Sequence, residues 1–148
     1  GHPKTQLMGW REVERLRFDG FEVGSHSEAH RDLTRLSLAD AKHEIDGSKR
    51  TLEDHLGEAV EFFAYPYGRY GNTVRQLVQD AGYRAACATA PGFITQDADS
   101  FQLCRVEIAG TDSLRAFGRK IKFGLNEFTN IDLIRYYAGR VVTTAFGD

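Results

Sequence analysis

Short apolar segments alternate with longer amphipathic segments along this chain, and the alternation strongly limits the folds it can adopt. Apolar runs of strand length cover Val60–Ala64 and Tyr83–Ala88. Between them, apolar residues recur at helical spacing over Val74–Ala81, until Gly82. Strands that alternate with helices are typical of a parallel α/β sheet or barrel, so we expect that class.

The same criteria predict the other elements. Ser37 and Asp40 have the spacing of a helix cap, and Gly57 marks the end of the long helix that Ser37 opens. No internal repeat or low-complexity linker interrupts the 148 residues, which predicts a single domain over 1–148. The further elements that we expect are strands over Phe21–Val23 and Leu103–Ile108, and helices over Leu7–Arg17, Leu38–Leu56, Ser113–Ile121 and Asn126–Val142.

Composition excludes several classes of function. The chain has 21 acidic and 19 basic residues, a net charge of -2, so no excess of positive charge favours nucleic acid as a partner. Its apolar stretches are far shorter than the roughly 20 residues of a membrane-spanning helix, so we expect no transmembrane segment. Two cysteines are too few for a disulfide framework and leave the cellular location unknown.

The segment after the first expected strand carries two histidines, His26 and His30, within Gly24–His30. If this stretch forms one helical turn, both rings lie on one face and reach a common metal at about 2.0–2.1 Å. The alternative is that two solvent-exposed histidines share this spacing by chance. The spacing alone leaves both interpretations open.

The segment after Val60–Ala64 has the sequence Tyr65-Pro66-Tyr67-Gly68. Pro66 fixes one backbone angle and Gly68 frees another, which predicts a rigid loop. Its simplest interpretation is the exit of a strand. The functional interpretation is that the Tyr67 backbone N–H stabilises a developing oxyanion while the aromatic rings form a wall for a sugar.

Together the two segments resemble the polysaccharide deacetylases of the NodB-homology type, carbohydrate esterase family 4. The similarity covers residues 10 to about 110 and follows one order along the chain. Its elements are Trp10, Gly20–His30, Asp32-Leu33, Leu36-Ser37, Glu44-Ile45, Ser48-Lys49, Leu56-Gly57, Phe63–Gly68, Ala81–Tyr83 and Leu103–Arg105.

The resemblance implies a distorted (β/α) barrel and a divalent metal, commonly zinc, held by one aspartate and two histidines. By position the histidines are His26 and His30. It implies hydrolytic removal of acetyl groups, mostly N-acetyl, from a polysaccharide, with Tyr67 as the oxyanion-stabilising catalytic residue and Tyr65, Pro66 and Tyr67 in contact with substrate. It also suggests an extracytoplasmic or cell-envelope location.

The sequence departs from the family pattern at two places. It contains no T-F-D-D-like motif, which in the family supplies the catalytic base and the aspartate ligand, and all five histidines lie at or before His55, so the late general acid is missing. Asp19 precedes the strand and would lie roughly 15 Å from the metal. We expect Glu28 and Asp32 to be surface charges or helix supports.

These departures predict a barrel that is incomplete at its N-terminus, either because the first units were removed or because the aspartates were lost; we favour removal. The isolated chain is then weakly active or inactive. An alternative is a non-catalytic carbohydrate-binding or interaction module derived from this fold, and a further one is a structural zinc site of His26, His30, Cys87 and Cys104. Because open sheet edges seek a partner, we expect a homodimer or a C-terminal segment folded over the gap.

Overall fold

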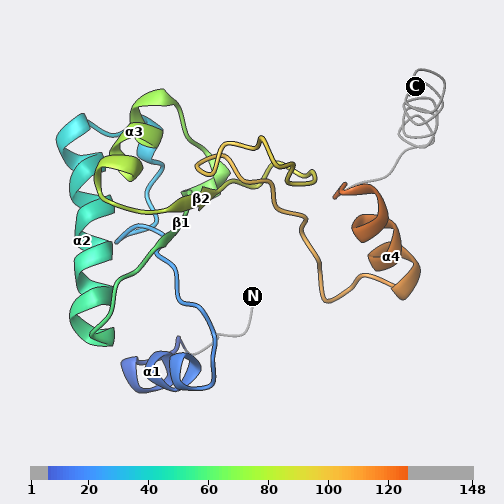
Figure 1. The fold of residues 1–148 in the computed structure, drawn as a ribbon, viewed down its shortest axis with the longest axis horizontal. Coiled ribbons are helices and arrows are strands. Elements are labelled where there is room, and N and C mark those ends of the chain that lie inside the picture. Colours follow the sequence, from blue (N-terminus) through green and yellow to red (C-terminus); the bar gives the residue numbers. More distant parts are fainter. Residues whose placement is uncertain (1–6, 127–148) are drawn as a thin grey trace, which may run out of the picture. The chain divides into compact units, whose positions relative to one another are not determined.

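The computed structural model describes residues 7–126, which form two units: residues 7–88 with 98–103, and residues 89–97 with 104–126. The single-domain interpretation stays a prediction. The helices, 3-10 turns (η) and strands, in chain order, are α1 (Trp10–Phe18), η1 (Leu33–Arg35), α2 (Leu38–Leu56), β1 (Phe62–Ala64), η2 (Pro66–Gly68), α3 (Asn72–Asp80), β2 (Ala85–Cys87) and α4 (Leu114–Phe123) (Figure 1).

Parallel pairing of β1 with β2 forms the centre of the first unit, with Phe63 opposite Ala86. Isolated parallel bridges add Ser25 beside Phe63 on one side and Leu103 beside Cys87 on the other. The connection from β1 to β2 runs through α3, as a parallel pair requires. The α/β class with a parallel sheet is therefore confirmed. The part of the chain that the structure describes contains this small sheet, and the distorted barrel, incomplete at its N-terminus, stays a prediction.

The helices begin and end where side chains satisfy their terminal backbone groups. The Ser37 hydroxyl accepts the N–H of Asp40 at the start of α2, and Gly57 ends α2 in the left-handed conformation with a φ of 70°. Ser113 caps α4 in the same way by accepting the N–H of Ala116, and Gly124 ends it with a φ of 65°. The predicted helices of these two regions are confirmed.

The strand predicted over Phe21–Val23 is wrong. The backbone of Phe21 bonds to the end of α1, because its N–H donates to the Leu16 carbonyl at 3.0 Å and its own carbonyl accepts from Arg17 Nη1 at 2.9 Å. These hydrogen bonds occupy the backbone N–H and carbonyl of Phe21, which would otherwise pair with a neighbouring strand. The chain joins the sheet only at Ser25.

The strand predicted over Leu103–Ile108 is limited to its first residue. Leu103 pairs with β2, whereas Cys104 and the residues after it belong to the second unit, where the Arg105 N–H donates to the Ala90 carbonyl at 2.9 Å. Apart from Asn126, the helix predicted over Asn126–Val142 lies outside the described residues. No helix in residues 7–126 is long and apolar enough to span a membrane.

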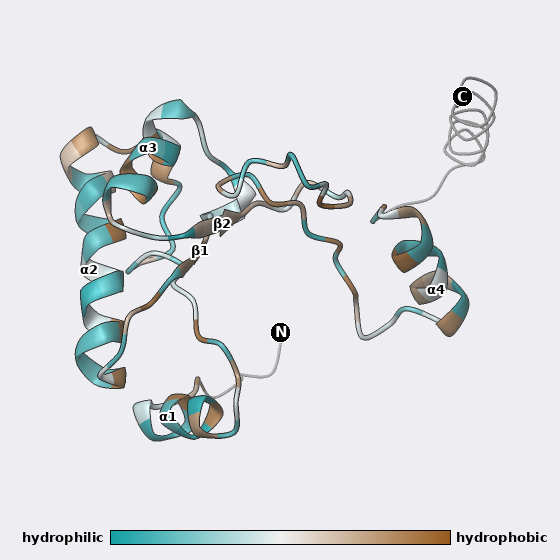
Figure 2. Cartoon of the chain, in the orientation of Figure 1, coloured by the Kyte–Doolittle hydropathy of each residue, from teal (hydrophilic) through white to brown (hydrophobic). Residues whose placement is uncertain are grey.

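The core of the first unit lies between the strands and the two helices α2 and α3, which contact each other (Figure 1). Phe63 is at its centre, with ring centroids 5.6 Å from Tyr65 and 5.2 Å from Tyr83. Figure 2 shows long hydrophilic stretches on α2, as expected of a helix with one buried side. The buried apolar residues are Leu33, Ala41, Ile45, Val60, Phe63, Tyr65, Val74, Leu77, Val78, Tyr83, Ala86 and Ala88.

Truncation of Phe63, which is 2% exposed, tests this core. We expect Phe63→Ala to lower the free energy of unfolding by about 3–5 kcal/mol, because it removes buried apolar surface and leaves a cavity. Phe18→Ala is the control, since Phe18 is 87% exposed and its truncation should change stability by about 0.5 kcal/mol or less. Urea denaturation followed by circular dichroism measures both. Equal losses in the two variants would contradict this description of the core.

Candidate active site

The two loops that the sequence singled out meet at the carboxyl end of β1. His26 Nδ1 lies 2.7 Å from the backbone carbonyl oxygen of Ala64, the last residue of that strand. The ring centroids of His26 and His30 are 4.7 Å apart, and those of His30 and Tyr67 are 4.6 Å apart. The structure thus brings together the two predicted metal ligands and the predicted catalytic residue.

The histidines approach each other through a strained loop, so the helical turn considered from their spacing is not what brings the two rings together. Ser27 and His30 have positive φ values of 63° and 53°, and the His30 N–H donates to Ser27 Oγ at 3.0 Å. Tyr67 has a φ of 57°. Within residues 7–126 these three are the non-glycine residues with positive φ, and strain of this kind collects at functional sites.

The imidazole of His26 has a feature expected of a metal ligand. A ring nitrogen bonded to a backbone carbonyl fixes the tautomer and leaves the other nitrogen able to bind metal, and the contact of His26 Nδ1 with Ala64 has this form. In residues 7–126, however, no group of three or more His, Cys, Asp or Glu side chains is placed to hold a metal ion. His26 and His30 could therefore supply two of the ligands of a metal ion, and the ligand set is incomplete. The structural zinc site of His26, His30, Cys87 and Cys104 has no support in residues 7–126.

The carboxylates nearest to the histidines in sequence have other partners. Asp32 accepts from the Thr34 hydroxyl at 2.6 Å and from Arg69 Nη1 at 2.8 Å, and these two hydrogen bonds, the Thr34 bond first, lower the pKa of Asp32. Glu28 Oε2 lies 3.7 Å from His43 Nε2 on α2. The expectation that Asp32 and Glu28 are surface charges or supports is confirmed.

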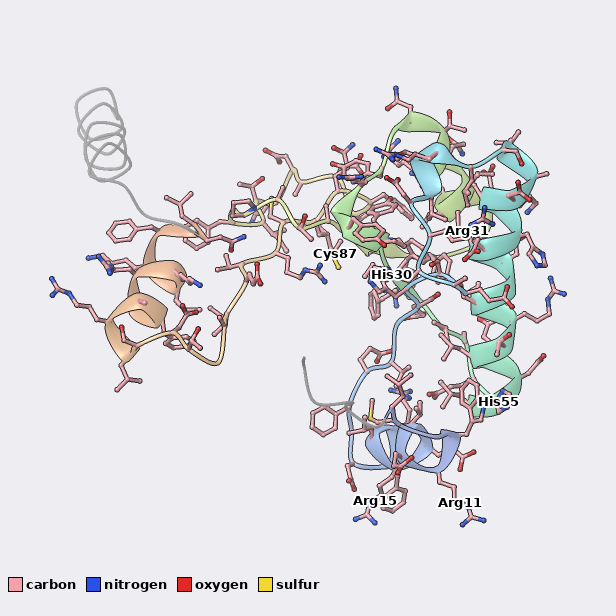
Figure 3. The ribbon with its side chains drawn as sticks, turned by 180° about the vertical axis from the view of Figure 1, so that it is seen from behind. Arg11, Arg15, His30, Arg31, His55 and Cys87 are labelled. Atoms are coloured by element: carbon pink, nitrogen blue, oxygen red, sulfur yellow. The ribbon has the colours of Figure 1, made fainter. Side chains whose placement is uncertain are left out.

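Asp19 and His55 belong to the region around α1. Asp19 pairs with Arg15 at 3.0 Å, and the ring of His55 stacks on Trp10 with centroids 3.6 Å apart. Figure 3 shows His55 near the end of α2 beside α1, away from His30. Neither residue takes part in the candidate site.

Contact of Tyr65 and Pro66 with substrate stays a prediction, and the structure places both side chains in the interior. Tyr65 is fully buried, its hydroxyl donates to the Phe101 carbonyl at 3.0 Å, and Pro66 is also buried. Alternation along β1 places Tyr65 on the same inward face as Phe63. Tyr67 is 57% exposed and is the aromatic residue of this loop that reaches solvent.

Sequence analysis named Glu44 and Ser48 only as part of the family resemblance and missed that, from α2, they support Ser25–His30, the segment that carries the histidines. Glu44 and Ser48 are 5% and 7% exposed, and both hydrogen-bond to the segment that carries the histidines. Ser48 lies on the buried side of α2, together with Ala41 and Ile45. A glutamate and a serine four residues apart on such a side were the available signal.

The chain matches the family model described as polysaccharide deacetylase over residues 2–86, more than half of its 148 residues. It therefore belongs to the polysaccharide deacetylase family. The sequence resemblance is confirmed by this match.

Solved structures and a curated relative agree with this assignment. The polysaccharide deacetylase BC0361 from Bacillus cereus is 30% identical and superposes with a TM-score of 0.70, covering 77% of this chain and 36% of that one. The Streptococcus pyogenes deacetylase PplD, in complex with acetate, has a TM-score of 0.72 over 78% of this chain and 51% of its own, and at 22% identity it shows the fold alone. YxkH of Bacillus subtilis is 25% identical over 111 residues, which are 75% of this chain and 40% of YxkH.

The buried tyrosines predict a loss of stability at alkaline pH. Burial is the main cause that raises the pKa of Tyr65 and of Tyr83 above the unfolded value of about 10. The folded state therefore keeps its protons where the unfolded state releases them, so stability present below about pH 10 falls as the pH rises, by up to about 1.4 kcal/mol per pH unit for each tyrosine.

We expect Tyr65→Phe to lose less stability than the unmodified chain between about pH 9 and pH 11, measured by urea denaturation at each pH. Tyr67→Phe, at an exposed position of the same loop, is the control. If Tyr65→Phe and the unmodified chain lost equal stability over this range, the linkage to Tyr65 would be disproved.

Proposed function

We propose that this chain supplies the histidine half of the active site of a metal-dependent hydrolase that removes acetyl groups, mostly N-acetyl, from a carbohydrate polymer. One observation carries the proposal: His26 and His30 lie with ring centroids 4.7 Å apart beside Tyr67, in a chain of the polysaccharide deacetylase family. The chain spans 36% of BC0361 and 40% of YxkH, so an active site shared with further segments is compatible with these relatives.

His26 and His30 would hold a divalent metal, for which zinc is the family expectation. When bound, such a metal polarises a carbonyl oxygen and lowers the pKa of bound water. The chain's own contribution is orientation: the hydrogen bond between His26 Nδ1 and the Ala64 carbonyl holds the first ring. The second ring packs edge-on against Tyr67.

Tyr67 would face the substrate. Its exposed ring offers an apolar surface to a sugar, and its backbone N–H is the proposed donor to the oxyanion of the amide that is cleaved. Arg69 supports this residue, since its guanidinium carbon lies 5.9 Å from the Tyr67 ring centroid and its Nη1 is bonded to Asp32. The ion pair of Asp32 and Arg69 thus supports the loop that carries Tyr67.

A second candidate is a non-catalytic carbohydrate-binding module that retains the sugar-contacting loop. The observation in its favour is the absence of a third metal-binding side chain beside the histidines in residues 7–126. Asp32 is instead engaged by the Thr34 hydroxyl and by Arg69.

Zinc titration tests the metal site. We expect one zinc ion to bind weakly per chain, because two protein nitrogens leave the remaining positions to water or buffer, and we expect His26→Ala and His30→Ala to abolish the binding. His55→Ala is the control, since that ring stacks on Trp10. Calorimetry measures all four proteins, and equal heats from the unmodified chain and His26→Ala would contradict the proposal.

Acetate release from N-acetylglucosamine oligomers separates the two candidate functions. We expect barely measurable release by this chain alone, because an acid and a base each contribute about 10²- to 10⁴-fold, and the sequence contains neither the T-F-D-D-like motif nor a late histidine. Binding of the oligomers without release would favour the carbohydrate-binding module. Robust turnover that His30→Ala abolishes would show that the chain carries a complete active site.

A further inference from the structure

We infer that Glu44 and Ser48 of α2 are positioning residues that hold Ser25–His30, the histidine loop, in its metal-binding geometry; this inference rests on the proposed function. Within residues 7–126, neither side chain hydrogen-bonds to an imidazole. Each acts on the backbone or side chain of the residue that precedes a histidine.

Glu44 anchors the second half of the histidine loop. Its Oε2 accepts the backbone N–H of Glu28 at 3.1 Å and that of Ala29 at 2.8 Å. Its Oε1 lies 3.8 Å from Arg31 Nη1. The carboxylate is nearly fully buried and has lost most of its hydration. These hydrogen bonds compensate for that loss.

Ser48 anchors the first half of the loop. Its hydroxyl lies 2.7 Å from that of Ser25, which is 2% exposed. The backbone of Ser25 is fixed at the same time by the sheet, because its N–H donates to the Phe62 carbonyl and its carbonyl accepts from Ala64, both at 2.8 Å.

The spacing of the two anchors matches the spacing of the ligands. Glu44 and Ser48 are four residues apart and therefore lie on one face of α2. Ser25 directly precedes His26, and Ala29 directly precedes His30. One rigid helix thus fixes the backbone immediately before each ring.

The anchors also explain how the loop keeps its strained conformation. Left-handed φ values at Ser27 and His30 persist only where surrounding contacts impose them. Hydrogen bonds to residues 25, 28 and 29 fix the chain on both sides of Ser27 and immediately before His30. Without them the chain would relax, and the two imidazoles would separate.

Hydrogen exchange of the metal-free chain tests the anchoring itself. We expect the amides of Glu28 and Ala29 to exchange more slowly in the unmodified chain than in Glu44→Ala. Glu44→Gln should retain the protection, because an amide oxygen also accepts two N–H groups. Glu53→Ala is the matched control: Glu53 lies on the same helix, and its carboxylate accepts the Val60 N–H at 2.9 Å.

Zinc titration of the same variants tests the consequence for the site. We expect Glu44→Ala to weaken zinc binding about 10- to 100-fold, while Glu44→Gln and Glu53→Ala bind as the unmodified chain does. Ser48→Ala should also weaken binding, and it keeps the test decisive if Glu44→Ala does not fold.

The outcomes of this titration separate the inference from the proposed function. Unchanged zinc affinity in the folded Glu44→Ala variant, or in Ser48→Ala if Glu44→Ala does not fold, would overturn the positioning role. Failure of the unmodified chain to bind zinc would overturn the metal site, while loss of amide protection in Glu44→Ala would still support the anchoring.

Discussion

Parallel pairing between Ser25, β1 and β2 is the interaction on which the rest of the site depends. Parallel strands share one carboxyl edge, so the residues that follow Ser25 and those that follow Ala64 emerge side by side. The hydrogen bond between His26 and the Ala64 carbonyl spans these two exits directly. A shift of one residue in this pairing would turn Phe63 out of the core and move the histidine loop away from Tyr67.

The long helix α2 serves the core and the site at once. Ala41 and Ile45 bury apolar surface on its inner side, while Glu44 and Ser48 on the same side bond to the histidine loop. Polar groups in such a position stabilise a fold only where every one of them finds a partner. The two anchors meet that condition, so the packing of the helix and the geometry of the loop are coupled.

Sequence patterns located the long helices and the two loops because caps, glycines and apolar spacing are local signals. Ser37 and Gly57 bound α2 as predicted. The strand expected at Phe21–Val23 was wrong because apolar composition cannot tell whether a partner strand or the end of α1 takes the backbone bonds. The inward position of Tyr65 and the anchoring role of Glu44 depend on which segments meet in space, which a local pattern does not contain.

The strained backbone of the two loops at this site is held in place by contacts from the core. Three non-glycine residues of residues 7–126 adopt positive φ, and all three lie in the loops that carry the candidate ligands and Tyr67. Conformations of this kind each cost on the order of 1–3 kcal/mol, which a surface loop without bracing would recover by relaxing. Here Glu44 and Ser48 brace one loop, and the buried Tyr65 and Pro66 brace the other. Because each loop is fixed from the core side, the imidazoles and the Tyr67 ring are held close together, which would lower the entropy cost of the proposed binding of a metal or a sugar.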